Sequence, residues 1–180
     1  MSSATPATNL ITLTINGTQV QAAPGTVLVD AAAAVGIEIP IFCYEPRLGA
    51  PIGACRMCLV EIEGMRGLQT ACSTPVGPDM VVNTNSAPAV EAQDGVLELL
   101  LANHPLDCPV CDKGGECPLQ DRTFKFGPGE TRFSEPKRHF PKPLDLSPLV
   151  AIDRERCITC YRCVRFSQEV AEDLQLTFQE

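Results

Sequence analysis

The sequence HPLDCPVCDKGGEC, residues 104–117, places one imidazole and three thiols within fourteen positions. Histidine nitrogen and cysteine sulfur are ligands for zinc and for iron, and side chains this closely spaced can close around one metal centre. More cysteines lie on both sides of this segment. Together they indicate three consecutive metal-binding sets: Cys43, Cys55, Cys58 and Cys72 in the first set, His104, Cys108, Cys111 and Cys117 in the second, and Cys157, Cys160 and Cys163 in the third.

The composition indicates a loop-rich chain without a large aromatic core. Its 180 residues include 16 Pro, 13 Gly and no Trp. Because the first Lys or Arg is Arg47, the sequence has neither the basic start of a secretory signal nor the Arg-rich face of a transit peptide. We therefore expect a reducing cytoplasm, where ten clustered cysteines are metal ligands rather than disulfides.

Charge and hydropathy limit the possible partners. The net charge of −8 argues against nucleic acid, which requires a concentrated basic surface. One basic segment, residues 122–142, carries six Lys or Arg against two Glu, and we interpret it as a solvated loop or a subunit-docking surface. No apolar run reaches the roughly 20 residues that a membrane span needs, so any membrane contact is expected to come through partners.

The N-terminal part has the pattern of a small mixed sheet crossed by a helix. Apolar residues alternate over 10–15 and 18–22 around the turn Asn16-Gly17, which predicts a β-hairpin. A short helix is expected to follow, capped by Thr26 and ended by Gly36. Further strands are predicted at 59–63 and 80–82.

The second part is predicted to be helical around its ligand loops. A helix is expected over 90–103, with Val90, Leu97, Leu100 and Leu101 on one face, and Pro105 disfavours its continuation through His104. The proline-rich residues 124–148 predict an extended connection across a surface. A final helix is expected from 164 to about 174.

The spacing of the first set favours a cluster over a single ion. Its order C-x11-C-x2-C-x13-C resembles the plant-type [2Fe–2S] pattern, although eleven residues stand where that pattern has four. A structural zinc is the alternative, but zinc prefers paired C-x2-C knuckles and only Cys55 and Cys58 form one. We expect backbone N–H donors toward sulfur from residues 49–54.

The other two sets leave more than one ligand chemistry open. The second set is consistent with a cluster in which imidazole replaces one thiolate, and zinc held by three cysteines and one histidine is its competitor. The third set has the three-cysteine core of the C-x2-C-x2-C-x3-C run, but Ser167 stands at the fourth position. Either the fourth ligand lies in a continuation beyond this sequence, or the site binds a three-cysteine cluster.

The three motifs together resemble the N-terminal iron–sulfur region of the large iron–sulfur subunit of respiratory complex I, the G-subunit family of bacterial NADH–quinone oxidoreductases. The resemblance covers about residue 10 to the end of the chain, and its most specific part is the second set with the following PLQD. That family continues into a larger domain, so the resemblance implies a truncated chain. The outer motifs also occur in [FeFe]-hydrogenases and in the diaphorase subunits of NAD-linked hydrogenases and formate dehydrogenases.

The resemblance implies an α+β fold, with a β-grasp [2Fe–2S] ferredoxin-like domain followed by a loop-rich helical iron–sulfur region. It assigns a [2Fe–2S] cluster to the first set, a [4Fe–4S] cluster to the second, and a second [4Fe–4S] cluster to the third where a fourth ligand is supplied. The implied divisions are a disordered lead-in at 1–9, the ferredoxin-like domain at 10–87, the histidine- and cysteine-ligated [4Fe–4S] segment with its extended connection at 88–148, and an incomplete [4Fe–4S] ferredoxin-type domain at 149–180.

The function that the resemblance implies is electron transfer from a flavin on a partner subunit toward quinone, with no catalytic residue in this chain. The implied partners are peripheral-arm subunits of complex I, including the subunit that binds flavin and NADH, on the cytoplasmic face of a bacterial inner membrane. The diaphorase subunit of an NAD-linked hydrogenase or formate dehydrogenase is the alternative in the same class. A zinc-binding interaction module is the alternative of another class.

Overall fold

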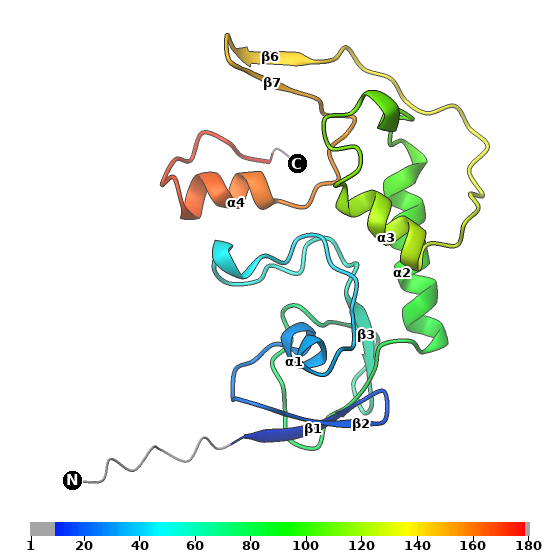
Figure 1. Cartoon of the computed structure of the whole chain (residues 1–180), viewed down its shortest axis with the longest axis vertical. Helices are drawn as coiled ribbons and strands as arrows, with labels where there is room; N and C mark the ends of the chain where they lie inside the picture. The colour runs from blue at the N-terminus through cyan, green and yellow to red at the C-terminus, as the bar shows by residue number, and fades with distance from the viewer. Residues whose placement is uncertain (1–9, 179–180) are drawn as a thin grey trace.

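The computed structural model describes residues 10–178 and has an α+β fold, with one five-stranded sheet near the N-terminus and helices and loops beyond it (Figure 1). The expected lead-in at 1–9 lies outside the described residues. The sheet has the order β2-β1-β5-β3-β4, in which β1 and β5 are parallel and the other neighbours are antiparallel. The strands are β1 (Ile11–Ile15), β2 (Thr18–Ala22), β3 (Leu59–Ile62), β4 (Gln69–Thr70) and β5 (Val81–Asn83).

The first hairpin forms as the alternating pattern predicts. Leu13, Ile15 and Val20 point into the core and are buried, while the threonines between them face outward. Asn16 and Gly17 have φ values of 50° and 79°, as the tight turn between two twisted strands requires. The hairpin prediction is confirmed, and the sheet places its buried face under helix α1.

Helix α1 (Leu28–Ala34) begins differently from the sequence prediction. Its N-cap is Val27, and no side chain caps it, so the expected cap at Thr26 is wrong. Backbone pairing replaces the cap, because Leu28 N–H donates to Thr74 O and Val29 N–H donates to Ala71 O. The helix end agrees with the prediction, since Gly36 follows with a φ of 78°.

Helix α2 (Ala87–Ala102) joins the sheet to the ligand loops of the second half. It starts three residues before the predicted start because Pro88 is accommodated in its first turn. Gln93, a buried polar residue, donates through Nε2 to the Leu59 carbonyl of β3 at 3.0 Å. Of the predicted apolar face, Leu97 is fully buried whereas Val90 is exposed.

The last third contains more regular structure than the sequence predicted. Helix α3 (Pro118–Phe126) follows the second ligand set directly, and the strands β6 (Leu144–Ser147) and β7 (Val150–Ile152) form a hairpin. The expectation of an extended connection is therefore wrong at both of its ends. Helix α4 (Arg162–Glu169) ends five residues before the predicted 174. Short 3-10 turns, η1 (Pro46–Leu48) and η2 (Cys108–Val110), lie inside the ligand loops.

Two separate apolar cores organise the molecule. The first core fills the space between the sheet and α1, and includes three cysteines of the first set. The second core is much smaller: Phe42, Met57, Leu97 and Leu119 are its buried members. It connects α2 and α3 to the first ligand loop, and α2 also packs directly against β3.

Intramolecular contacts hold the basic segment 122–142. The pairs are Arg122 and Lys125 with Glu38, Arg132 with Glu98, Lys137 with the carbonyls of Leu101 and Ala102, and Lys142 with Asp107 and Glu155. The interpretation as a solvated loop is therefore incomplete, because these side chains fasten the segment to α2 and to the sheet domain. Within residues 10–178, no helix combines the length and the apolar character of a membrane span.

Candidate metal centres

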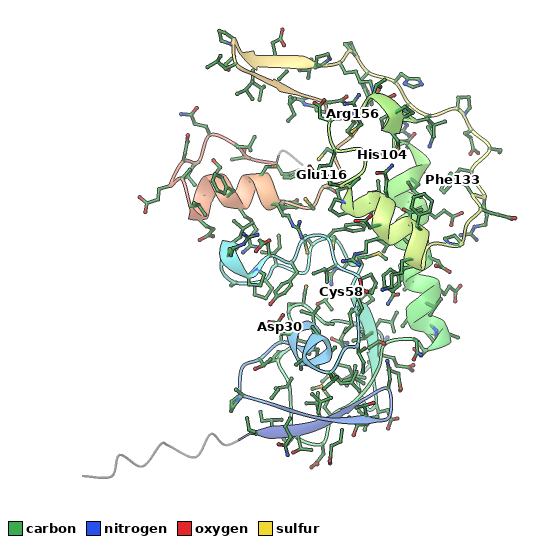
Figure 2. All side chains as sticks on the ribbon, in the orientation of Figure 1. Asp30, Cys58, His104, Glu116, Phe133 and Arg156 are labelled. Carbon is green, nitrogen blue, oxygen red and sulfur yellow. The ribbon has the colours of Figure 1, made fainter. Side chains whose placement is uncertain are left out.

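The structure brings the four cysteines of the first set together inside the first core. Cys43, Cys58 and Cys72 are buried and Cys55 is partly buried. Cys43 N–H donates to Cys55 Sγ, and the thiols lie close enough for one to shift the pKa of the other in the pairs Cys43–Cys55, Cys43–Cys72 and Cys58–Cys72. Residues up to 29 positions apart in the sequence thus form one group, as the sequence analysis expected. Figure 2 shows Cys58 between the sheet and the helices.

A backbone N–H group points at a sulfur atom of this group. Cys43 N–H donates to Cys55 Sγ at 3.4 Å. Such donors stabilise negative charge on thiolate ligands. Donors were expected from residues 49–54, but the N–H donor to sulfur in this set is that of the ligand residue Cys43.

The protonation of these thiols has to change when a metal cluster binds. The hydrogen bond with Cys43, together with burial, raises the pKa of Cys55 well above its usual range, while the hydrogen bond with Cys72 lowers the pKa of Cys58. For Cys72, the hydrogen bond with Cys43 lowers the pKa, but the bond with Cys58, burial and neighbouring thiolates outweigh it and raise the pKa to about 11. Ligation therefore displaces protons from this set.

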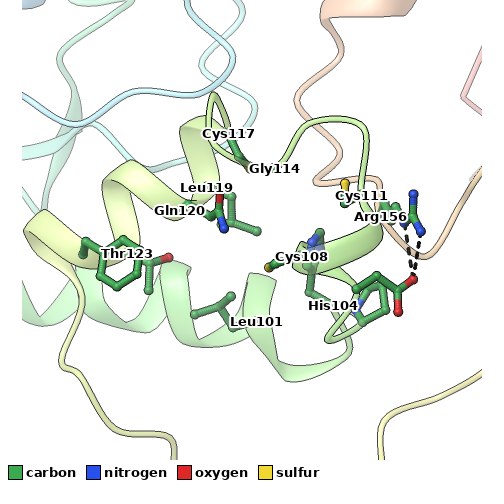
Figure 3. Close-up of a pocket in the computed structure, with 13 residues that line it drawn as sticks. Leu101, His104, Cys108, Cys111, Gly114, Cys117, Leu119, Gln120, Thr123 and Arg156 are labelled. Carbon is green, nitrogen blue, oxygen red and sulfur yellow. Dashed lines mark hydrogen bonds and ion pairs between the residues drawn. The ribbon is translucent and has the colours of Figure 1, made fainter.

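The second set lines one pocket between α2, η2 and α3. His104, Cys108, Cys111 and Cys117 all border a cavity of about 200 Å³. Figure 3 shows these four side chains around the pocket, with Leu101 and Leu119 beside them. The remaining walls of the cavity are largely apolar. Three thiols and one imidazole face it and form its donor set. These donors fit a metal cluster in chemistry and in position.

His104 reaches this pocket because α2 stops just before it. The C-cap of α2 is Asn103, and Pro105 turns the chain toward the cysteine loop. Burial lowers the pKa of His104, and the positive charges of Lys137 and Arg156 lower it further. The imidazole is therefore neutral near pH 7, which is the form that can ligate a metal.

An ion-pair network behind the second set was not predicted from the sequence. Asp107, next to the ligand Cys108, lies 2.6 Å from Lys142 and 3.1 Å from Arg156. Lys142 also lies 2.7 Å from Glu155, whose side chain is almost fully buried. The network ties the loop of the second set to the residues that precede the third set. No local motif signals it, because Lys142 and Arg156 lie 35 and 49 positions from Asp107 and only the fold joins them.

Gly114 leaves no room for a side chain within the second ligand loop. A Cβ there would lie 2.7 Å from Cys108 O and 3.1 Å from Cys111 O, both of which are backbone atoms. We expect Gly114→Ala to displace the loop at a cost of about 1–3 kcal/mol, the usual range for overpacking. Iron content after anaerobic reconstitution should fall relative to that of the unmodified chain.

Gly95→Ala provides the matched control. Nothing lies within 4 Å of a Cβ at Gly95, which is inside α2. This substitution should leave the iron content unchanged and stabilise the helix by about 1 kcal/mol. Equal loss of iron in both variants would contradict the steric argument.

The third set is less assembled than the other two. Cys157 borders a cavity with Phe140 and Lys142, whereas Cys163 lines a different one beside η1. Thr159 and Tyr161 lie between the cysteines and have φ values of 51° and 63°. Two residues of this ligand loop therefore have a left-handed backbone conformation. Ser167, at the position of the missing cysteine, donates its hydroxyl to Asp173 O and stabilises the turn after α4.

One cysteine of each set contacts the second core. Cys55, Cys117 and Cys160 all pack against it, although they are separated by up to 105 positions in the sequence. Among residues 10–178, no three His, Cys, Asp or Glu side chains converge as they do around a single metal ion. One cysteine from each set thus lies against a common apolar centre.

Three family models match successive parts of the chain. Residues 8–87 match a 2Fe-2S iron-sulfur cluster binding domain, residues 93–132 match the NADH-ubiquinone oxidoreductase-G iron-sulfur binding region, and residues 147–180 match the ferredoxin-like domain of NADH-quinone oxidoreductase subunit 3. Each match contains one of the three ligand sets. The chain therefore has one [2Fe–2S]-binding domain followed by [4Fe–4S]-binding regions.

Similar proteins agree with these matches. The G subunit of NADH-quinone oxidoreductase from Mycobacterium bovis is 52% identical over 95% of this chain, and that from Streptomyces coelicolor is 51% identical over 94%. A solved NAD⁺-reducing [NiFe]-hydrogenase in its H₂-reduced state has a TM-score of 0.80 and 32% identity, covering 94% of this chain and 70% of the hydrogenase chain. The chain spans 21% of the length of the Mycobacterium relative. On these matches, and on the three ligand sets that they contain, the chain belongs to the G-subunit family of NADH-quinone oxidoreductases.

Proposed function

We propose that this chain is an iron–sulfur electron-transfer part of an NADH:quinone oxidoreductase, which receives electrons from a flavin on a partner subunit and passes them toward quinone. The observation that carries the proposal is the common apolar centre, the second core, which one cysteine of each ligand set contacts. An electron carrier needs its redox groups near one another, and this arrangement supports that requirement.

The proposal assigns each ligand set its own cluster. Cys43, Cys55, Cys58 and Cys72 hold the [2Fe–2S] cluster, and His104, Cys108, Cys111 and Cys117 hold a [4Fe–4S] cluster. Cys157, Cys160 and Cys163 hold a second [4Fe–4S] cluster once a fourth ligand is supplied. The proximity of the four thiols of the first set supports the first assignment. The pocket that all four residues of the second set line supports the second. When bound, these clusters supply one-electron reduction and oxidation.

The residues of the chain position and insulate the clusters rather than perform bond chemistry. Phe42, Met57 and Leu119 exclude water from the space between the sets. The backbone N–H group of Cys43, which donates to Cys55 Sγ, favours negative charge on sulfur. The network around Asp107 and Lys142 keeps the second and third ligand loops at fixed positions.

Exposed apolar side chains near the second set support docking to partner subunits. Phe124 on α3 is 88% exposed, and Leu106 and Val110 of the ligand loop are also exposed. Exposed apolar patches of this kind occur at protein–protein contacts. We propose that peripheral-arm subunits, including the one that binds flavin and NADH, cover such surfaces. Membrane attachment is then through partners, on the cytoplasmic face of a bacterial inner membrane.

The diaphorase subunit of an NAD-linked hydrogenase is the second candidate function. The specific observation in its favour is the likeness to the NAD⁺-reducing [NiFe]-hydrogenase over 94% of this chain. The identity of 52% to the Mycobacterium relative, against 32% to the hydrogenase, favours the quinone-linked function.

Metal analysis of the anaerobically purified chain tests the electron-transfer proposal. We expect brown protein with iron and acid-labile sulfide, and reduction should produce one slowly relaxing [2Fe–2S] signal and at least one fast-relaxing [4Fe–4S] signal in EPR spectra. A colourless product with stoichiometric zinc and no sulfide would instead favour a zinc-bound interaction module.

Activity of the native complex separates the two electron-transfer functions. A complex purified through a tag on this chain should oxidise NADH with a quinone as acceptor. Hydrogen-dependent reduction of NAD⁺ by that complex would favour the diaphorase function.

A further inference from the structure

Helix α4, which contains the last cysteine of the third set, lies against the loop of the first set. Figure 1 shows α4 next to η1, which is inside the loop between Cys43 and Cys55. The chain therefore brings the end of the third ligand motif to the [2Fe–2S] loop. Two arginines of α4, Arg162 and Arg165, make this contact.

Arg165 holds the [2Fe–2S] loop through its backbone. Its Nη2 donates to Leu48 O and, at 2.7 Å, to Ala50 O. These two carbonyls flank Gly49, whose φ of 78° turns the loop, and a Cβ on Gly49 would lie 4.0 Å from Nη2. One guanidinium thus fixes both sides of the turn in the segment that carries Cys55 into its group.

The burial of this arginine is unusual because carbonyls alone balance its charge. Arg165 is 5% exposed, and its Nη1 is buried without a hydrogen-bond partner among the described residues. In residues 10–178 no carboxylate forms an ion pair with it. Burying a cation in this way is costly unless negative charge lies nearby. Four thiolates around iron and sulfide supply a net negative charge at the first set.

We infer that Arg165 is a positioning residue for the [2Fe–2S] cluster, which fixes the loop between Cys43 and Cys55 and whose charge stabilises the reduced, more negative state of that cluster. The inference rests on the proposed assignment of the first set. It also gives the third ligand motif a second role, because Arg165 lies two residues after Cys163 and connects this motif with the first.

Arg165→Gln tests the inference, because glutamine keeps a hydrogen-bond donor but removes the charge. In an EPR-monitored redox titration, the [2Fe–2S] midpoint potential should fall. The expected change is about tenfold in the reduction equilibrium, the order of effect that one nearby charge exerts at an effective dielectric constant of about 20. For a one-electron couple this is about 59 mV. Arg165→Lys, which keeps the charge, should retain a potential near that of the wild type.

Arg47→Gln is the matched control. Arg47 lies in η1 of the same loop, but its side chain is 87% exposed and pairs with Glu45. Solvent screens its charge, so its removal should leave the potential unchanged.

The outcomes separate this inference from the assignment of the first set. If the wild type shows no [2Fe–2S] signal, the assignment itself fails. If the wild type has the signal and Arg165→Gln keeps both the signal and its potential, only the role of Arg165 is overturned. If Arg165→Gln loses the cluster, the Arg165→Lys variant is decisive. A cluster at the wild-type potential in Arg165→Lys supports the inference. Loss of the cluster or a shifted potential in that variant overturns it.

Discussion

His104→Ala is expected to abolish the [4Fe–4S] signal of the second set while the [2Fe–2S] signal is retained. His104 lines the second pocket, whereas the four thiols of the first set lie within the first core. Losing one of four ligands opens the cavity to solvent at that corner, and Ala supplies no donor in its place. Iron analysis should show a loss equivalent to that cluster, and EPR spectra of the reduced protein should show which signal disappears.

His139→Ala is the matched control, because the chain has two histidines. The His139 side chain is 74% exposed and lies 3.7 Å from Glu155, away from the pocket lining. Its replacement should leave iron content and both signals unchanged. If His104→Ala removes the [2Fe–2S] signal alone, the assignment of the sets is wrong.

His104→Cys refines the same experiment. Cysteine restores a fourth ligand but adds one negative charge to the cluster, so the reduced form becomes less favourable. The variant should regain a [4Fe–4S] signal at a lower potential than the wild type. Recovery at an unchanged potential would argue that imidazole is not a ligand.

The first hairpin was predictable because it is encoded locally, and the cysteine spacings that favour metal binding are local as well. Alternation over 10–22 with Asn16-Gly17 specifies two strands and their register, and short cysteine spacings specify metal chemistry. The long spacing between Cys58 and Cys72 carried no geometric information. Their proximity follows from β4 and the loop after it, which only the fold reveals.

The rest depends on contacts between distant parts of the chain. Lys142 and Arg156 look like solvated charges in the sequence, yet Asp107 is their partner in space. Helix α1 begins without a side-chain cap because carbonyls from the segment after β4 accept its first N–H groups, and this tertiary contact made the expected Thr26 cap unnecessary. In the sequence, Arg165 is one residue of the segment that carries the third ligand motif. Only its burial against Leu48 and Ala50 indicates that it positions the loop between Cys43 and Cys55.

Removal of the iron is expected to unfold the second half of the chain while much of the sheet domain stays folded. The first core is extensive and lies between α1 and the sheet, whereas the second core has few buried members, and the ligand loops beyond it are mostly exposed. A region with so little apolar burial relies on metal–ligand bonds for its stability, so metal binding and folding are coupled there.

Hydrogen exchange measured by mass spectrometry, with and without the clusters, checks this expectation. After anaerobic oxidation and chelation, peptides from β1, β2 and α1 should keep most of their protection, because Leu13, Ile15 and Leu28 remain buried without metal. Peptides covering residues 104–126 and 157–169 should exchange nearly as fast as unfolded chain. A uniform loss of protection would show that the two cores fold as one unit, and the second core would then transmit the loss of metal to the sheet through Phe42 and Met57.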